Sequence, residues 1–330
     1  MKNILVTGGA GFIGSHLVEK LLKNNKDKVT ILDNFSTGRK NNLKNFEKNK
    51  RLKIVKVDIS KISSIKKFFR KIDIVYHIAG LADIVPSIEK PQQYYESNVT
   101  GSFNVIKLCI DNNIKKLVYT ASSSCYGIPL KYPTNEKEKI DTQYPYALTK
   151  YLGEELVLNL GKIYKINVTS LRLFNVYGPK SRTSGTYGAV FGTFLAQKLA
   201  NKPFTVVGNG NQKRDFVFVS DVVDALISAS KLKKTNQVFN IGYGKCYSIN
   251  YIVKLLNGEK IFIPKRPGEP DCTLSNITKA KKLLNWKPKI TIEEGVSILL
   301  KNIDYWKNAP VWNEKKIQKA TKKWFEYLDK

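Results

Sequence analysis

Short apolar runs alternate with segments of helical spacing along the first half of the chain. After the first run the apolar residues recur every three or four positions, as on one face of a helix. The runs that predict strands are Ile4–Val6, Lys28–Leu32, Leu52–Val57, Ile74–Ile78, Lys116–Ala121 and Val168–Phe174. Segments between them that predict helices are Ile62–Phe69, Pro91–Asn112 and Pro145–Leu160. This alternation predicts an α/β fold with a doubly wound parallel sheet of the Rossmann type.

Three glycines close the first predicted strand and open a helix in the stretch Gly8–Gly14. Gly8 permits a tight turn, Gly11 lets the backbone approach a pyrophosphate, and Gly14 lets the helix pack close to the strand. A diphosphate there would meet free N–H groups and the positive end of the helix dipole. A glycine-rich turn in any α/β protein gives the same pattern, so this motif alone leaves both interpretations open.

Asp33 ends the second predicted strand, about 20 residues beyond the glycines. Its carboxylate can bond both ribose hydroxyls of an adenosine and repels a 2′-phosphate, which favours NAD over NADP. Arg39 lies close enough in sequence to weaken this preference, unless it is only a surface residue. We therefore expect NAD as the cofactor.

The regular alternation loosens beyond Gly178. Residues 181–188 predict a loop near the site, and Val190–Ala200 predicts an amphipathic helix. A strand and helix follow within Phe216–Ser230, and Gln237–Ile241 predicts a further strand. The remainder has the pattern of a smaller α/β region.

Two domains follow from this pattern. We expect a Rossmann domain that binds NAD over residues 1–178, to which a segment at about 216–245 returns. We expect residues 179–215 and 246–330 to form a smaller substrate-binding α/β region packed on the first, with the substrate cleft between them.

Polar or glycine residues fall at or just past the carboxyl ends of the predicted strands, where ligands bind in such sheets. These residues are Gly8, Asp33, Asp58, Gly80, Ser122 and Asn175. Their coincidence is a stronger signal than any single motif, and it predicts one site along this edge of the sheet.

A serine-rich strand end, Ala121–Gly127, precedes a helix that contains Tyr146 and Lys150. Their four-residue spacing puts both side chains on one helix face, one turn apart. A close ammonium stabilises a phenolate, and moving a tyrosine pKa from near 10 to about 7 takes roughly 4 kcal/mol. Such a tyrosine is a general base and acid near neutral pH. The alternative is a surface aromatic beside a solvated lysine, but the serine-rich strand end favours catalysis.

The formal net charge is +29, from 56 basic and 27 acidic residues. A nucleic-acid partner is one interpretation, but the lysines are dispersed and not interleaved with stacking aromatics, so we expect none. The positive field can steer an anionic substrate. No apolar run is long enough to span a bilayer, and the start of the chain has no secretory pattern. The four cysteines lack metal-like spacing, which predicts reduced thiols, no metal site and a cytoplasmic location.

Taken together, these motifs resemble the extended short-chain dehydrogenase/reductases, specifically the NAD-dependent nucleotide-sugar epimerases of the UDP-glucose/UDP-N-acetylglucosamine 4-epimerase type. The resemblance covers nearly the whole chain and is more specific for the superfamily than for the sugar. The segments that carry it are Thr7–His16, Asp33-Asn34, Asp58-Ile59, His77–Gly80, Ser87–Pro91, Asn98–Gly101, Ser122–Ser124, Tyr146 with Lys150, Leu171–Asn175, Arg214-Asp215 and Arg266–Glu269.

The resemblance implies roles for individual residues around the cofactor. Ser122 matches the catalytic serine or threonine, with Ser123 as a helper, and Tyr146 matches the acid/base. Lys150 would bind the nicotinamide ribose and tune the tyrosine. The cofactor-binding residues are then Gly8, Gly11, Phe12, Ile13, Gly14, Asp33, Asn34, Asp58, Ile59, Ala79, Gly80, Asn98, Tyr146 and Lys150. For Asn98 a bracing role is an open alternative.

On the substrate side, the resemblance assigns Asn175, Arg214 and Arg266 to the nucleotide diphosphate and Glu269 to the uridine ribose. Surface ion pairing is the alternative for the two arginines. Thr273 would border the hexose pocket, and its small side chain would leave room for an N-acetyl group. Ser122 and Tyr146 would also contact the sugar. We therefore expect N-acetylhexosamine nucleotides to be accepted.

The implied reaction inverts C4 of a nucleotide-activated hexose, either the UDP-glucose/UDP-galactose pair or the N-acetylhexosamine pair. Tyr146 takes the proton of the 4-hydroxyl while the 4-hydrogen leaves as hydride to NAD. A 4-keto sugar turns in the cleft, and hydride returns to its other face, so NAD is regenerated in each turnover.

Two positions depart from related enzymes. Ala82 stands where many UDP-galactose epimerases carry lysine. Dehydratases and decarboxylases of the family carry an acidic residue near the catalytic serine or threonine, whereas Ser123, Ser124 and Cys125 follow Ser122 here. That difference argues against dehydration.

Other interpretations stay open. A nucleotide-sugar dehydrogenase or reductase, or a uronic-acid epimerase, would use the same residues on a different sugar. A non-catalytic NAD-binding regulator would be marked by loss of Tyr146 or Lys150, and both are present. The helices at Pro91–Asn112 and Pro145–Leu160 match the family's dimer-forming pair, so we expect a homodimer.

Overall fold

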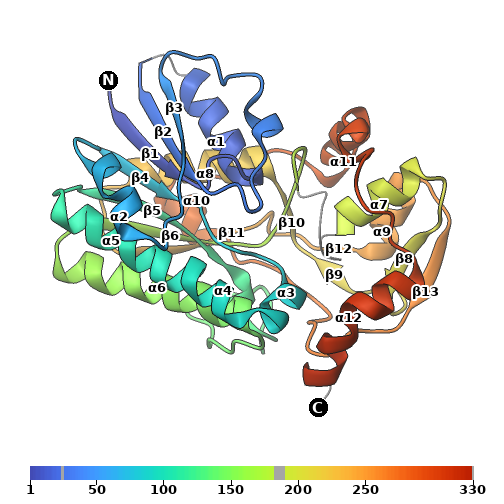
Figure 1. Cartoon of the computed structure of the whole chain (residues 1–330). Helices are drawn as coiled ribbons and strands as arrows, with labels where there is room; N and C mark the ends of the chain where they lie inside the picture. Colours follow the sequence, from blue (N-terminus) through green and yellow to red (C-terminus); the bar gives the residue numbers. More distant parts are fainter. Residues whose placement is uncertain (24–25, 182–189, 329–330) are drawn as a thin grey trace.

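One seven-stranded sheet forms the centre of the larger lobe (Figure 1). The computed structural model describes residues 1–23, 26–181 and 190–328. The strand order is β11-β6-β5-β4-β1-β2-β3, and every neighbouring pair is parallel. The strands are β1 (Asn3–Thr7), β2 (Lys28–Asp33), β3 (Leu52–Lys56), β4 (Ile74–His77), β5 (Lys116–Ser122), β6 (Asn167–Leu173) and β11 (Gln237–Ile241). The predicted doubly wound sheet is confirmed, and its order reverses between β1 and β4, where a ligand crevice forms.

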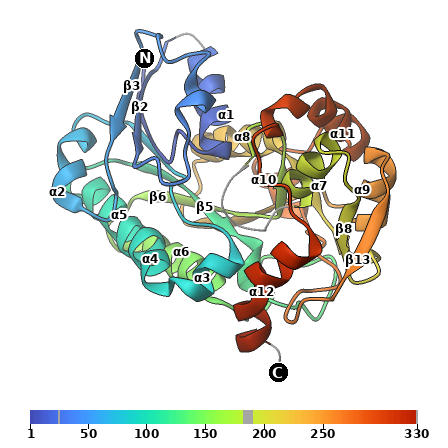
Figure 2. The same cartoon turned by 45° about the vertical axis from the view of Figure 1, so that its right-hand side comes forward.

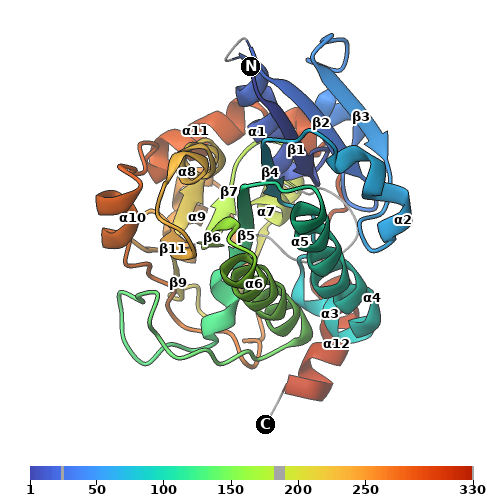
Figure 3. The same ribbon diagram turned by 90° about the vertical axis from the view of Figure 1, so that its left-hand side faces the viewer.

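Helices cover both faces of this sheet. In β1, Ile4 and Val6 face one apolar core while Leu5 faces the other, so the strand is apolar at successive positions. One face is covered by α1 (Phe12–Lys23), α8 (Val219–Lys231) and α10 (Thr278–Leu283). The other is covered by α2 (Ile62–Ile65), α5 (Gly101–Asp111) and α6 (Pro145–Ile163), with α5 and α6 side by side in Figure 3.

The helix expected over Pro91–Asn112 is interrupted. It consists of α4 (Pro91–Tyr95), a π-helical turn at Glu96–Thr100, and α5. Such turns insert an extra residue and often lie at functional sites. Here the turn buries Asn98 beside the predicted cofactor site. A short helix, α3 (Ile84–Glu89), precedes α4.

The smaller lobe has an aromatic core and three two-stranded pairings. Its strands are β7 (Asn175–Tyr177) with β10 (Phe216–Phe218), β8 (Phe204–Val207) with β13 (Lys260–Ile263), and β9 (Lys213–Arg214) with β12 (Tyr247–Ser248). Its helices are α7 (Val190–Leu199), α9 (Ile249–Leu256), α11 (Ile292–Lys301) and α12 (Glu314–Leu328). Tyr177 stacks on Phe191 and meets Phe216 and Phe218 edge-on, which ties α7 to both strands.

The returning segment and the C-terminal part divide differently between the lobes than the predicted boundaries suggest. β11 pairs with β6, and α8 packs against α1, within the larger lobe. Ala280 and Trp286 also pack into the sheet-side core, although residues 246–330 were expected in the substrate-binding region. The Trp286 indole N–H donates to the Asp221 carbonyl oxygen at 2.8 Å, which anchors this segment on α8.

The predicted loop at 181–188 lies outside the described residues except for Ser181. All four cysteines are free thiols. Within the described ranges, no helix has the length and apolarity needed to cross a membrane, and no group of three or more ligating side chains could hold a metal ion.

Candidate active site

A cavity of about 330 Å³ follows the carboxyl ends of β1, β2 and β4. It lies at the switch in strand order, where a nucleotide is expected in this architecture. The predicted cofactor residues that line it are Gly8, Gly11, Phe12, Ile13, Gly14, Asp33, Asn34, Asp58, Ile59, Ala79 and Gly80. The fold therefore brings residues from four separate segments to one groove.

The glycine turn shapes one wall of this nucleotide groove. Gly8 has a φ of +72°, a conformation that other L residues rarely adopt. A Cβ at Gly14 would lie 2.1 Å from the Gly8 carbonyl oxygen, so only glycine lets α1 begin this close to β1. The N-terminus of α1 thus opens directly on the groove and favours an anion such as a diphosphate.

Two carboxylates stand at the far end of the groove. Asp33 is buried, and its oxygens accept from the backbone N–H groups of Ala10 at 2.9 Å and Phe35 at 2.8 Å. Burial raises the pKa of Asp33 and these hydrogen bonds oppose the rise. Asp58 accepts from the Asn34 amide at 2.9 Å, so the predicted adenosine residues hold one another in place.

Asn98 braces the site from beneath. Its Oδ1 accepts from the Leu81 N–H at 2.8 Å, and its Nδ2 donates to the Leu81 carbonyl at 3.0 Å and to Thr149 Oγ1 at 3.1 Å. It is 1% exposed. Asn98 was expected among the cofactor-binding residues, but its amide is committed to the loop after Gly80 and to α6. These hydrogen bonds favour the bracing role that the sequence left open, and a contact with the cofactor stays a prediction.

Tyr146 stands beside two serine hydroxyls at the end of β5. Ser122 Oγ lies 2.8 Å from Ser124 Oγ, and both serines hydrogen-bond with Tyr146. The Tyr146 ring stacks on Tyr144 with centroids 6.3 Å apart and meets Tyr94 edge-on. Ser123 was expected to be the helper, whereas the hydroxyl that meets Ser122 and Tyr146 belongs to Ser124.

The pKa of Tyr146 is raised in this structure. Burial raises it above its ordinary value, and the hydrogen bond with Ser122 offsets part of the rise. The Lys150 ammonium donates to the Thr120 carbonyl oxygen. The expected fall toward 7, driven by Lys150, stays a prediction.

The side chain of Lys150 extends from α6 toward the floor of the nucleotide groove. Its ammonium donates to the Thr120 carbonyl oxygen and lies 4.5 Å from the centre of the Tyr119 ring. A Cβ on Gly80 would come within 3.5 Å of this ammonium, which places Lys150 at the nucleotide groove. Burial lowers the pKa of Lys150 to about 8, and the charge of Glu154 opposes that shift.

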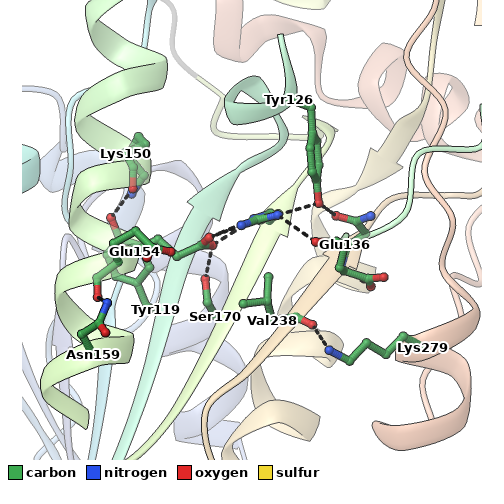
Figure 4. Close-up of polar contacts among 12 residues, drawn as sticks. Tyr119, Tyr126, Glu136, Lys150, Glu154, Asn159, Ser170, Val238 and Lys279 are labelled. Atoms are coloured by element: carbon green, nitrogen blue, oxygen red, sulfur yellow. Dashed lines mark hydrogen bonds and ion pairs between the residues drawn. The ribbon is translucent and has the colours of Figure 1, made fainter. Parts of the chain in front are cut away.

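A buried polar network lies directly behind Lys150 (Figure 4). Glu154, one helical turn farther along α6, accepts from Arg172 Nε at 2.9 Å and from Ser170 Oγ at 2.7 Å. Arg172 also donates to the Tyr126 hydroxyl at 3.0 Å. Tyr126 ends the short turn that carries the serines, so the network joins α6, β6 and the serine segment.

A second cavity, of about 240 Å³, is lined by residues of the smaller lobe and by Asp83 and Ile84 of the larger lobe. Asp83 lines both this cavity and the nucleotide groove, so the two adjoin. The predicted substrate residues in its wall are Asn175, Arg214, Arg266 and Glu269. We call it the substrate cavity.

Charged side chains pair within the substrate cavity. Glu269 lies 3.3 Å from Arg266 and 3.7 Å from Arg214, and all three side chains are largely buried. Burial lowers the pKa of Arg214, and Glu269 opposes the shift. The charged side chains in the wall are Arg214, Arg266, Asp83 and Glu269, which cancel in formal charge, and the two guanidinium groups are the donors that suit phosphate oxygens.

Thr273 reaches this cavity through Asn175. Its hydroxyl donates to Asn175 Oδ1 at 3.0 Å and accepts from the Asp215 N–H at 3.1 Å. The side chain is therefore held in one position by two hydrogen bonds. This placement agrees with a position at the border of the substrate cavity, while its expected role toward the hexose stays a prediction.

The sequence analysis missed three residues of the site, namely Ser124, Glu154 and Trp324. Ser124 stands one position from the serine that was selected, and Glu154 could have been found as the next residue on the Tyr146–Lys150 helix face. Trp324 lines the substrate cavity from the far end of the chain, and only the folded structure brings it there.

The residues of the groove fit NAD. Gly8, Gly11 and Gly14 leave backbone exposed for a diphosphate, Asp33 suits a ribose without a 2′-phosphate, and Lys150 closes the opposite end. Tyr146 lies one helical turn from Lys150 and hydrogen-bonds with Ser122, which supports proton transfer next to the nucleotide groove.

Comparison with known proteins also indicates an enzyme that binds NAD. Residues 4–242 match the model of the NAD dependent epimerase/dehydratase family. The chain is 36% identical over 309 residues to UDP-glucose 4-epimerase of Lactobacillus helveticus, a match that covers 87% of this chain and 92% of that protein.

Solved structures are similar over most of the chain. UDP-N-acetylglucosamine 4-epimerase from Methanobrevibacter ruminantium M1, in complex with UDP-N-acetylmuramic acid, gives a TM-score of 0.85 at 32% identity over 91% of this chain and 99% of that one. UDP-glucuronic acid 4-epimerase from Bacillus cereus, in complex with UDP-glucuronic acid and NAD, gives a TM-score of 0.85 at 32% identity. That match covers 93% of this chain and 99% of the other. The chain therefore belongs to the NAD-dependent epimerase/dehydratase family, as an epimerase of the extended short-chain dehydrogenase/reductase type with NAD as its cofactor.

Proposed function

We propose that this protein is an isomerase that inverts C4 of a UDP-activated hexose through a 4-keto intermediate. The observation that carries the proposal is the position of Tyr146. Its hydroxyl meets Ser122, and its pKa is raised by burial and by the charge of Asp83, a residue that lines both the nucleotide groove and the substrate cavity. A sugar held in the cavity would present one carbon to both the tyrosine and the groove.

Proton transfer is the task of Tyr146 and the two serines. Tyr146 accepts the proton of the 4-hydroxyl as the C4–O bond becomes a carbonyl, and later donates it back. Ser122 and Ser124 donate hydrogen bonds to the oxygen as its charge changes. When bound, NAD supplies the hydride acceptor and then the hydride donor at C4, so the reaction has no net redox change.

Lys150 supports this proton transfer electrostatically. A buried ammonium at the floor of the groove favours the phenolate of Tyr146 over the neutral phenol. We assign it to the ribose next to the reacting ring as well, because its ammonium lies against Gly80. Glu154 keeps the ammonium charged from behind.

The substrate cavity binds the nucleotide part in this proposal. Arg214 and Arg266 contact the diphosphate, Glu269 accepts from a ribose hydroxyl, and Asn175 lies between them and the sugar. Glu269 pairs with both arginines and so holds the guanidinium groups in the cavity wall. Preorganised cations of this kind bind phosphate without a large ordering cost.

We infer that N-acetylhexosamine nucleotides are among the substrates. The hydroxyl of Thr273 is tied to Asn175 and the Asp215 backbone, so a small side chain with a fixed orientation borders the sugar. The three relatives compared above are named as 4-epimerases of UDP-glucose, UDP-N-acetylglucosamine and UDP-glucuronic acid. A uronic-acid epimerase is therefore the second candidate.

We also propose that the protein works as a homodimer in the cytoplasm. Tyr95, Phe103 and Leu148 are exposed on α4, α5 and α6, which pack side by side (Figure 3). Exposed large apolar side chains on these neighbouring helices suit a helical contact between two copies. Four free thiols suit a reducing compartment.

A substrate panel tests the proposal. The purified protein is incubated without added NAD with UDP-N-acetylglucosamine, UDP-glucose and UDP-glucuronate, and products are followed by NMR. We expect inversion at C4 of the N-acetylhexosamine nucleotide. Activity on UDP-glucose alone would contradict the sugar assignment, and release of a dehydrated or permanently oxidised sugar would contradict the reaction type.

A further inference from the structure

The C-terminal helix α12 carries one buried stripe. Ile317, Thr321 and Trp324 are each 4% exposed or less, while the rest of the helix is rich in lysine and faces solvent. Their spacing of four and three residues places them on one helix face. α12 lies outside residues 4–242, the part of the chain that the family model matches.

This stripe fastens α12 across both lobes. Ile317 packs against Val207 and Ile263, at the ends of β8 and β13 in the smaller lobe. The helix also lies against α3 of the larger lobe (Figure 2). α12 therefore bridges the mouth of the cleft between the two lobes.

Trp324 is the member of the stripe that reaches the substrate cavity. It lines that cavity together with Arg214 and Glu269. The Arg266 guanidinium lies over the indole, 5.0 Å from the ring centroid, and the indole N–H donates to the Pro267 carbonyl oxygen at 2.8 Å. The indole thus holds both the side chain of Arg266 and the backbone beside it.

We propose that α12 forms a wall of the substrate cavity and that Trp324 is a positioning residue, which holds Arg266 for the diphosphate of the nucleotide substrate. This inference rests on the proposed function, which assigns Arg266 to the diphosphate. A flexible arginine at a loop would lose several rotamers on binding a phosphate. The Arg266 guanidinium already contacts the Trp324 indole and Glu269, so its rotamers are restricted before the phosphate binds.

The geometry separates this role from simple support of the helix. Ile317 already anchors α12 in an apolar cluster some two turns away from Trp324. If Trp324 served only to attach the helix, its ring would have no need to lie against Arg266, the one cation of the segment Arg266–Glu269. Loss of the indole should therefore weaken the binding of ligands that carry a diphosphate and leave the affinity for uridine unchanged.

Titration calorimetry with the NAD-loaded protein tests the proposal, using UDP and uridine as ligands. Trp324→Ala should weaken UDP binding about tenfold, the size expected for a desolvated cation–π contact plus a hydrogen bond, with uridine affinity unchanged. Trp324→Phe keeps a ring over the guanidinium but loses the N–H donor, so it should recover part of the affinity. Tyr327→Ala, an exposed aromatic on the same helix, is the matched control.

Kinetics provide the second readout. For a substrate accepted by the wild type, Trp324→Ala should raise KM while kcat stays within about twofold, because Tyr146 and Ser122 are untouched. Wild-type UDP affinity in Trp324→Ala, or an equal loss for UDP and uridine, would overturn the proposal. A wild type that binds UDP but inverts no sugar would overturn the proposed function instead, and the calorimetry would still decide the role of Trp324.

Discussion

At the residue scale, the proposed chemistry depends on a few polar groups that are held by contacts with their neighbours. Tyr146 is fixed between two aromatic rings, and its hydroxyl meets Ser122 and Ser124. Burial keeps its pKa high in the free protein, so the phenolate must be generated within the site. That requirement gives Lys150 a function beyond binding a ribose.

Tyr146→Phe removes the proton carrier and little else. The ring stacking with Tyr144 is kept, so the fold and NAD content should be unchanged. General acid–base catalysis contributes about 10²–10⁴-fold, and kcat for sugar inversion should fall by that factor. A variant that retains wild-type turnover in the NMR assay would show that another group moves the proton.

Lys116 provides a pH-dependent test that is separate from catalysis. It is buried at the opposite end of β5 and bonds to Asn167, Thr169 and the Leu232 carbonyl. Burial lowers its pKa to about 8, so between pH 8 and 10.5 the unfolded chain holds more protons at this residue than the folded one. Its contribution to the free energy of unfolding therefore rises with pH over that range.

Lys116→Met should remove this rise. After a discount for partial exposure, we expect the free energy of unfolding of the wild type to gain about 1–2 kcal/mol relative to the variant between pH 8 and 10.5. Urea titrations of both proteins at several pH values measure the difference. Parallel pH profiles for the two proteins would contradict the assigned ionisation.

At the element scale, helix α6 carries the site on one face. Tyr146, Lys150 and Glu154 follow at four-residue intervals, and Glu154 connects the helix to Arg172 on β6 (Figure 4). The Glu154–Arg172 ion pair is almost completely inaccessible to water. Neither charge can be left alone there, because an unpaired buried charge is costly.

Glu154→Gln should therefore cost about 3–5 kcal/mol of unfolding free energy, since it leaves the Arg172 guanidinium buried without its counter-ion. Asp111→Asn is the matched control, because it breaks the exposed ion pair with Lys107 and should cost under about 1 kcal/mol. Equal losses in urea denaturation would show that the buried pair is not special. The double change Glu154→Leu/Arg172→Met should recover part of the loss.

Elements with strong periodicity could be predicted from sequence, and those set by tertiary contacts could not. The strands and the Tyr146–Lys150 face were correctly expected because apolar periodicity and local spacing define them. The π-helical turn at Glu96–Thr100 was missed because it arises from how Asn98 must reach Leu81 and Thr149. Ser124 was passed over for Ser123 because a tight turn, not a strand alternation, orients these serines.

At the scale of the whole molecule, the substrate cavity is assembled from segments far apart in the chain. Asn175, Arg214 and Glu269 come from the middle of the sequence, and Trp324 comes from its last helix. Trp286 likewise contacts α8 of the larger lobe, although it lies far beyond that helix in the sequence. Such long-range packing leaves no periodic trace in sequence.

The dimer proposal belongs at this scale as well. Phe103→Glu and Leu148→Glu place charges on the exposed faces of α5 and α6, and we expect them to yield a monomer of 37.5 kDa in light scattering. Phe262→Glu, on the exposed face of β13, should leave a dimer of twice that mass. A monomeric wild type would contradict the proposal.

The most direct test of the central claim is the fate of the hydrogen at C4. The wild-type protein converts a UDP-hexose in D₂O, and the epimer is examined by NMR. Because the hydrogen leaves and returns as hydride within the closed site while Tyr146 exchanges only the hydroxyl proton, we predict an inverted C4 that keeps its protium. Deuterium at C4, or no inversion of any UDP-hexose, would contradict the account.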